Sequence, residues 1–159
     1  MTAPAVFRGP PSAVPAAAMA DHHLARILIV DDQPSNLHLL ERTLRRGGYL
    51  DVSSTTDPRA VAGLHRRDPY DLIVLDLQMP EMNGFEVMAR LYDLPGPQPA
   101  VLVMSAASAH MAAAFEAGAS GYLGKPFFLP DVVARVELVL ATAFAGDEPV
   151  SGPEERPSA

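Results

Sequence analysis

The stretch DLIVLDLQMPEMNG, residues Asp71 to Gly84, decides how the rest of the chain is arranged. It begins with a short apolar run, Leu72 to Leu75, and Asp76 follows that run directly. A run of apolar residues bounded by turn-forming residues is typical of a buried strand in a parallel sheet. Reacting groups in such sheets lie just beyond the carboxyl ends of the strands, so Asp76 is a candidate reacting group. The alternative is a carboxylate that only caps the following turn.

The composition indicates one soluble domain of ordinary size with tails. The chain has 159 residues, of which 48% are hydrophobic, and carries a net charge of -7. This acidity argues against nucleic acid as a direct partner, because phosphate binding needs a basic face. The absence of cysteine excludes disulfides, thiolate metal sites and cysteine nucleophiles, and it suits a reducing cytoplasm.

No segment predicts a membrane span. The most apolar long stretch, Phe127 to Ala145, contains Asp131, Arg135 and Glu137, which suits an amphipathic helix of a soluble protein. A signal peptide is disfavoured because prolines interrupt the Ala-rich start of the chain.

Strand-like and helix-like segments alternate along the chain. The predicted strands cover residues 27–30, 50–55, 72–75, 100–104 and 121–123, and the predicted helices cover residues 34–46, 58–67, 85–91, 111–117 and 130–143. Five strands that alternate with five helices indicate an α/β fold, a doubly wound (βα)5 parallel sheet with helices on both faces.

Three regions follow from this pattern. We expect residues 1–23 to be a disordered Ala/Pro-rich arm, residues 24–145 to be the folded domain, and residues 146–159 to be a disordered acidic tail. The adjacent His22 and His23 are expected to be solvated rather than to form a metal pair. Met19 is an alternative start of translation.

Polar side chains follow four of the five predicted strands. Asp31 and Asp32 follow the first strand, Asp76 the third, Ser105 the fourth and Lys125 the fifth. These strand ends converge in one crevice of a doubly wound sheet. Three carboxylates placed together repel one another unless a cation is present, and a hard divalent ion such as Mg²⁺ fits ligands that are all oxygen.

This set of groups suits phosphoryl chemistry. A carboxylate beside Mg²⁺ can accept a phosphoryl group, while an ammonium and a hydroxyl hold the phosphoryl oxygens. No GxGxxG or GxxxxGK[ST] motif is present, which disfavours a nucleotide cradle. Each residue also has an ordinary alternative: Lys125 as a surface lysine, Ser105 as a strand-end hydroxyl, and the Asp31-Asp32 pair as a helix cap.

The motifs ILIVDD, LIVLDLQMPEMNG, VLVMSA and GYLGKPF together resemble those of response-regulator receiver domains of two-component signalling, which have the flavodoxin-like CheY-like fold. The resemblance covers about residues 25–145. It implies that Asp76 is the phosphoacceptor, that Lys125 pairs with the phosphoryl group and that Ser105 is the switch hydroxyl.

The same resemblance implies a Mg²⁺ site and a second switch residue. Asp31, Asp32, Asp76 and the backbone carbonyl of Gln78 would hold the ion, with Asp32 as a direct ligand. Tyr122 would be the switch aromatic, although an ordinary half-buried strand aromatic is the alternative.

The resemblance also implies a cis peptide bond before Pro126. One feature departs from the family. Ser105 and Lys125 are 20 positions apart, where family members usually have 22, so two residues are missing between Ala106 and Gly118.

We expect a stand-alone response regulator that is phosphorylated by a sensor histidine kinase or phosphotransfer protein and signals through protein contacts. The predicted contact face, which could also form a homodimer, comprises the helix at 111–117, the strand at 121–123 and the last helix. Two alternatives remain: an adaptor that works without phosphorylation, and a phosphatase acting on an external substrate. The protein is not expected to be an enzyme, to bind nucleic acid or to bind a membrane.

Overall fold

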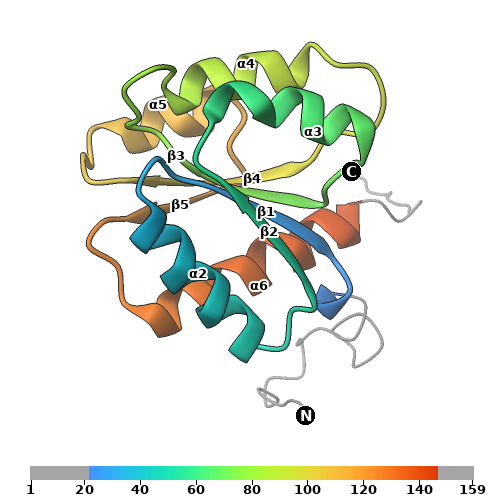
Figure 1. The fold of residues 1–159 in the computed structure, drawn as a ribbon, viewed down its shortest axis with the longest axis vertical. Helices are drawn as coiled ribbons and strands as arrows, with labels where there is room; N and C mark the ends of the chain where they lie inside the picture. The colour runs from blue at the N-terminus through green and yellow to red at the C-terminus, as the bar shows by residue number, and fades with distance from the viewer. Residues whose placement is uncertain (1–21, 147–159) are drawn as a thin grey trace, which may run out of the picture.

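The computed structural model describes residues 22–146, which form a five-stranded parallel sheet with helices on both faces (Figure 1). The strands are β1 (Arg26–Val30), β2 (Asp51–Thr55), β3 (Leu72–Asp76), β4 (Ala100–Ser105) and β5 (Gly121–Gly124). The helices are α2 (Pro34–Arg46), α3 (Val61–Arg67), α4 (Gly84–Tyr92), α5 (His110–Glu116) and α6 (Leu129–Gly146), with a short 3-10 turn, η2 (Pro58–Ala60), before α3.

The predicted fold class is confirmed. The strand order is β2-β1-β3-β4-β5, so the chain leaves β1 toward one edge of the sheet and then returns to the other side of β1. The position between β1 and β3 is therefore the topological switch point, where doubly wound sheets place their sites. No helix within residues 22–146 is both long and apolar enough to cross a membrane.

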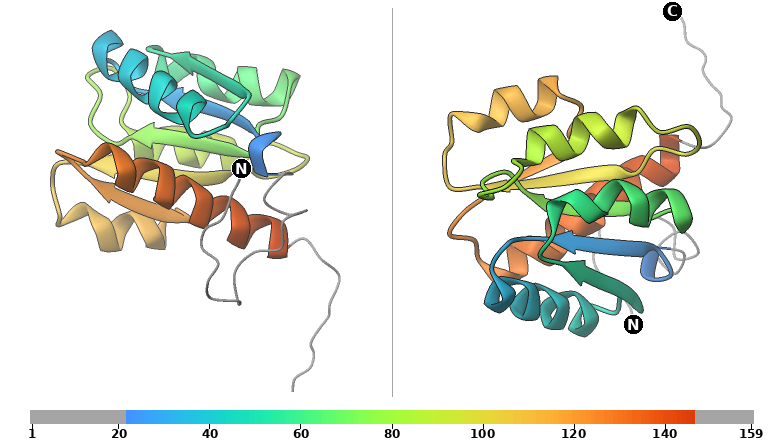
Figure 2. Two further views of the ribbon diagram at one scale, coloured as in Figure 1. Left: turned by 90° about the horizontal axis from the view of Figure 1, so that it is seen from below. Right: turned by 45° about the horizontal axis from the view of Figure 1, so that its top comes forward.

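The two faces of the sheet bury alternate residues of the same strands. Ile27 and Ile29 of β1 pack beneath α2 and α6, whereas Leu28 and Val30 pack against the side covered by α3, α4 and α5. In Figure 2, α2 and α6 lie side by side across their shared face. Because both faces of the sheet are covered, the central strands read as continuous apolar runs rather than as alternating ones.

Parallel pairing aligns the carboxyl ends of the strands. Val30 of β1 pairs with Leu75 of β3, so the residues that follow them, Asp31 and Asp76, are neighbours at the same edge. Asp76 itself pairs with Met104, which extends β3 one residue beyond the predicted end. The sheet register therefore decides which side chains meet.

The two histidines at the start of the described residues pack against the domain. His22 is buried, and its ring packs at a 40° tilt against Phe144 of α6, with centroids 5.1 Å apart. The ring of His23 lies edge-on to Tyr49, with centroids 5.2 Å apart. The expectation of a solvated side chain is wrong for His22, because its ring packs against an aromatic side chain that is distant in sequence, whereas His23 is only half-buried. Residues 1–21 and 147–159 lie outside the described part, so the predicted arm and acidic tail remain predictions there.

Gly84 allows the loop after β3 to close tightly against the strand. A Cβ atom at this position would lie 2.8 Å from the carbonyl oxygen of Asp76 and 2.9 Å from the Cα atom of Leu77. Both neighbours are backbone atoms, which cannot move aside as a flexible side chain can.

We predict that Gly84→Ala lowers the free energy of unfolding by about 1–3 kcal/mol, the usual cost of overpacking. Gly63→Ala is the matched control, because Gly63 lies in α3 with nothing within 4 Å of an added Cβ. It should raise stability by about 0.5–1 kcal/mol through helix propensity. Urea unfolding of both variants measures the difference, and equal effects would contradict this account of the loop.

Candidate functional site

Three carboxylates and one ammonium meet at the switch point of the sheet. One carboxylate oxygen from each of Asp31, Asp32 and Asp76 lies within 4.8 Å of the other two. Lys125 Nζ lies 3.3 Å from Asp31 Oδ2 and 3.3 Å from Asp76 Oδ2. The structure therefore brings together the four charged residues that sequence reasoning placed at the ends of β1, β3 and β5.

Asp31 is buried, and several donors hold its carboxylate in place. Oδ1 accepts a hydrogen bond from the backbone N–H of Gln33 at 3.0 Å, and Oδ2 accepts one from the side-chain amide of Asn36 at 3.2 Å. The Lys125 ammonium donates to the same Oδ2. Asn36 was not predicted, although its position in the first turn of α2 after the acidic pair favours such a contact.

Asp32 has a different environment. It is half-buried, and its side chain lines a hollow shared with η2 and the loop after β3, where Arg59 and Glu81 form an ion pair. Within residues 22–146, no hydrogen bond or ion pair to the Asp32 carboxylate is found. Asp32 is therefore the acid of the pair that is freer to bind a ligand from solvent.

Asp76 is almost fully buried and carries an electrostatic penalty. Burial raises the pKa of the Asp76 carboxyl above its ordinary value, and the charge of Asp31 adds to this effect. The backbone N–H of Gln78, which donates to Oδ1 at 3.1 Å, and the Lys125 ammonium lower the same pKa and offset only part of the penalty. A further cation would favour the ionised form.

The donor set fits a hard divalent cation. All three clustered side chains offer carboxylate oxygens, and the site lacks the sulfur and imidazole ligands that softer metals prefer. The pKa of the Asp76 carboxyl stays above its ordinary value, chiefly because of burial, even with Lys125 beside it. The acidic pocket could therefore bind one divalent ion. Gln78 follows Asp76 closely, and its carbonyl as a ligand stays a prediction.

Ser105 and Tyr122, at the end of β4 and in β5, form hydrogen bonds with the loop between β4 and α5. The Ser105 side chain is fully buried, and its Oγ accepts a hydrogen bond from the N–H of Ala107 at 3.1 Å and lies 3.0 Å from His110 Nδ1. The Tyr122 hydroxyl donates to the carbonyl oxygen of Ala107 at 2.9 Å. His110 was not predicted, although it lies within the segment that is two residues shorter than usual.

The loop after β5 also matches the expectation for Pro126. The peptide bond between Lys125 and Pro126 is cis, as the resemblance implies. It lies directly after the lysine that reaches Asp31 and Asp76.

Comparison with known proteins decides the family. A family model described as the response regulator receiver domain matches residues 27–137. The chain belongs to this family.

Individual relatives of the receiver agree with this assignment. The chain is 39% identical over 137 residues to the transcriptional regulatory protein PrrA of Mycobacterium leprae, which covers 82% of this chain and 58% of that protein. The chain spans about half the length of the curated relatives it matches.

Solved structures are also similar. A two-component response regulator of the LuxR family from Aurantimonas sp. SI85-9A1 has 34% identity and a TM-score of 0.65, covering 75% of this chain and 86% of that one. Chemotaxis protein CheY4 of Vibrio cholerae has 25% identity and a TM-score of 0.62, covering 73% and 98%. The receiver fold predicted from the motifs is confirmed.

The raised pKa of Asp76 leads to a stability prediction. In metal-free buffer at neutral pH, Asp76→Asn should melt at a higher temperature than the wild type, because it removes a buried charge that the folded state disfavours. The difference should vanish below about pH 4, where the carboxyl is protonated in both the folded and the unfolded chain. Thermal unfolding in a chelator across this pH range measures it.

Asp93→Asn is the control, because Asp93 is an exposed aspartate at the end of α4. Adding Mg²⁺ at ten times its dissociation constant should stabilise the wild type by about 1.4 kcal/mol. The Asp76→Asn variant should gain much less stability from the same Mg²⁺ concentration, because it lacks one of the carboxylates expected to bind the ion. An Asp76→Asn variant that is less stable than the wild type in the chelator would contradict the electrostatic account.

Proposed function

We propose that this receiver accepts a phosphoryl group on Asp76 from the phosphohistidine of a sensor kinase or phosphotransfer protein, and that the modified domain signals by protein contact. The observation that carries the proposal is the position of Asp76, buried between Lys125 and two further acids at the switch point of the sheet. In the transfer, the bond from phosphorus to the donor imidazole nitrogen breaks, and that nitrogen keeps the electron pair. A bond forms between phosphorus and an Asp76 carboxylate oxygen.

The residues around Asp76 have distinct parts in this reaction. The carboxylate must be ionised to attack, and the Lys125 ammonium at 3.3 Å favours that form. The Gln78 N–H at 3.1 Å fixes the orientation of the carboxylate. Lys125 also supplies charge to stabilise the phosphoryl oxygens once the bond has formed.

Asp31, Asp32, Asp76 and the Gln78 carbonyl would hold Mg²⁺. When bound, this ion supplies positive charge that neutralises the phosphoryl oxygens. Asp31 is already held by Lys125, Gln33 and Asn36, so Asp32 and Asp76 are the side chains best placed to bind the ion directly.

The surface around β5 is the proposed site of protein contact. β5 is the edge strand of the sheet, with α5 on one side and α6 on the other (Figure 1). Large apolar side chains are exposed on these helices and on the loop between β5 and α6: Met111, Phe115, Phe128 and Leu138. We propose that these side chains contribute to the contact surface.

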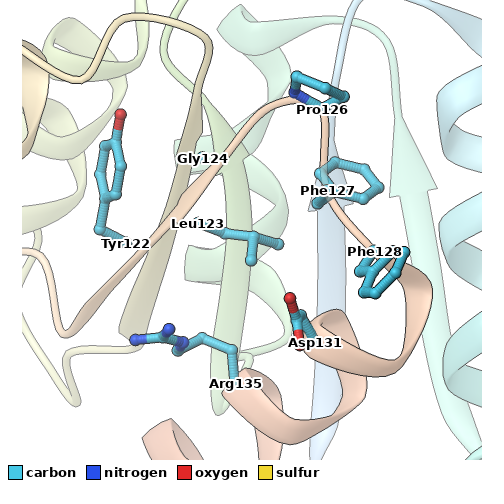
Figure 3. A pocket seen from close by; sticks show the side chains of 8 residues that line it. All are labelled: Tyr122, Leu123, Gly124, Pro126, Phe127, Phe128, Asp131 and Arg135. Atoms are coloured by element: carbon cyan, nitrogen blue, oxygen red, sulfur yellow. The ribbon is translucent and has the colours of Figure 1, made fainter.

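A hollow continues this surface between β5 and the start of α6 (Figure 3). Its lining combines apolar and charged groups, with Phe127 and Phe128 on one side and Asp131 and Arg135 reaching in from α6. An apolar surface with charged groups beside it suits either a partner protein or a second receiver.

Three further properties of the protein stay predictions. The PrrA relative is named as a transcriptional regulatory protein and is longer than this chain, so a stand-alone regulator without nucleic-acid contact remains a prediction. The cytoplasmic location and the absence of turnover on an external substrate are predictions of the same kind.

Phosphorylation is tested with Mg²⁺ and a small acyl phosphate or phosphoramidate donor. The wild type should gain the mass of one phosphoryl group, with an acid-stable, base-labile linkage, and Asp76→Asn should gain none. The exposed control Asp93→Asn should be labelled like the wild type. Lys125→Ala should lose about ten-fold or more in labelling rate, because a charged hydrogen bond is worth about 1.5–3 kcal/mol.

The competing functions give different results in this assay. An adaptor that works without phosphorylation predicts no label on the wild type. A phosphatase predicts continuous release of phosphate in molar excess over protein.

Dimerisation is tested by sedimentation with and without beryllofluoride, a phosphoryl mimic. We expect the mimic to shift the wild type from monomer to dimer and Phe115→Ser to weaken that dimer about ten-fold or more, as for a buried interface aromatic. Leu50→Ser is the control, because Leu50 is 70% exposed and precedes β2 at the opposite edge of the sheet. A monomer under both conditions would contradict dimerisation.

A further inference from the structure

Ser105 has only one hydroxyl proton to donate, and His110 competes for it. Ser105 Oγ already accepts the N–H of Ala107 at 3.1 Å, so this hydroxyl has one remaining lone pair and one proton to place. His110 Nδ1 lies 3.0 Å away, whereas the alternative acceptor, the Ala107 carbonyl oxygen, lies at 3.5 Å. The imidazole is therefore the better partner for the proton in this conformation.

The protonation of the His110 ring decides the direction of this hydrogen bond. A neutral ring with a lone pair on Nδ1 accepts the Ser105 proton. A protonated ring carries N–H on both nitrogens, so Nδ1 donates to Ser105 Oγ and the hydroxyl proton becomes free. The same contact at 3.0 Å can thus either occupy or release the one proton that Ser105 can offer a phosphoryl oxygen.

We infer that His110 is a positioning residue for the Ser105 hydroxyl. The neutral ring withholds the hydroxyl from a phosphoryl group on Asp76, and the protonated ring makes it available. Ser105 lies directly after Met104, which pairs with Asp76 in the sheet, so the freed hydroxyl stands at the same edge as the acceptor. This inference rests on the proposed phosphorylation of Asp76.

The surroundings of His110 hold its ring in this position. Its backbone N–H donates to the Ala107 carbonyl oxygen at 2.9 Å, and the same oxygen accepts the Tyr122 hydroxyl of β5 at 2.9 Å. Phe85 of α4 meets the ring edge-on, with centroids 6.1 Å apart. The ring is thus fixed by β4, α4 and the loop that Tyr122 tethers.

Few other titratable groups face this ring. Within residues 22–146, no carboxylate lies within ion-pair distance of His110. The acid beside Phe85 on α4, Glu86, is held by Asn83 in the cap of that helix, and Glu116 lies at the far end of α5. Tyr122 is the titratable group that approaches from β5.

The test compares beryllofluoride affinity of the wild type and His110→Phe, in Mg²⁺, from about pH 8 to about pH 5.5, the range in which a histidine gains its proton. The Phe variant keeps an aromatic ring against Phe85 but cannot accept the Ser105 proton. We expect it to bind the probe about five-fold more tightly than the wild type at the higher pH, the factor for one neutral hydrogen bond. The ratio of the two affinities, His110→Phe to wild type, should approach one at the lower pH. Taking the ratio at each pH cancels the pH dependence of the probe itself.

His38→Asn is the matched control, because His38 is an exposed histidine on α2, and its ratio to the wild type should stay at one throughout. Nitrogen NMR of the wild-type His110 ring provides a second readout that needs no variant. Nδ1 should carry no proton at the higher pH. A ratio for His110→Phe that is independent of pH, or a protonated Nδ1 in the neutral ring, would overturn the inference.

The same experiment separates this inference from the function on which it rests. If beryllofluoride binds in a way that Asp76→Asn abolishes but the His110→Phe ratio is flat, the phosphoacceptor function stands and the role of His110 is wrong. If no Asp76-dependent binding occurs in any variant, both fail.

Discussion

The Lys125 ammonium, 3.3 Å from a carboxylate oxygen of Asp31 and 3.3 Å from one of Asp76, is the interaction on which the site depends. Parallel pairing of β1 with β3 forces the two acids to be neighbours, and their burial makes the mutual repulsion strong. The lysine comes from beyond β5, two strands away from β3. A buried ion pair of this kind is weak evidence for stability, so its best explanation is the chemistry of the site.

The sheet could be predicted because the apolar pattern of its strands is clear in the sequence. Both faces are covered, so the residues of β1, β3 and β4 are apolar almost without interruption, and such short runs between turn formers are typical of buried parallel strands. The residues at which the strands end were harder to predict from the sequence. Asp76 and Ser105 still take part in the sheet ladder, although their polar side chains suggest that the strands have already ended.

The contacts that could not be predicted depend on the path of the chain in space. His22 lies after an Ala/Pro-rich stretch, and its contact with Phe144 depends on where α6 runs in space. Asn36 reaches Asp31 because α2 begins directly after the acidic pair. His110 meets Ser105 because the loop between them turns back on itself, and that turn depends on backbone hydrogen bonds rather than on a sequence period.

Helix α5 is short, so the polar contacts of the loop before it matter for the position of that loop. Its seven residues bury only Ala114 in the core, whereas α4 buries four residues. Elements with few buried apolar contacts are held weakly and open at low cost. The position of the loop before α5 is therefore determined largely by polar contacts of Ser105, His110 and Tyr122 around the Ala107 peptide. Under the proposed phosphorylation of Asp76, a phosphoryl oxygen would be a new acceptor for the Ser105 proton and would compete directly with those contacts.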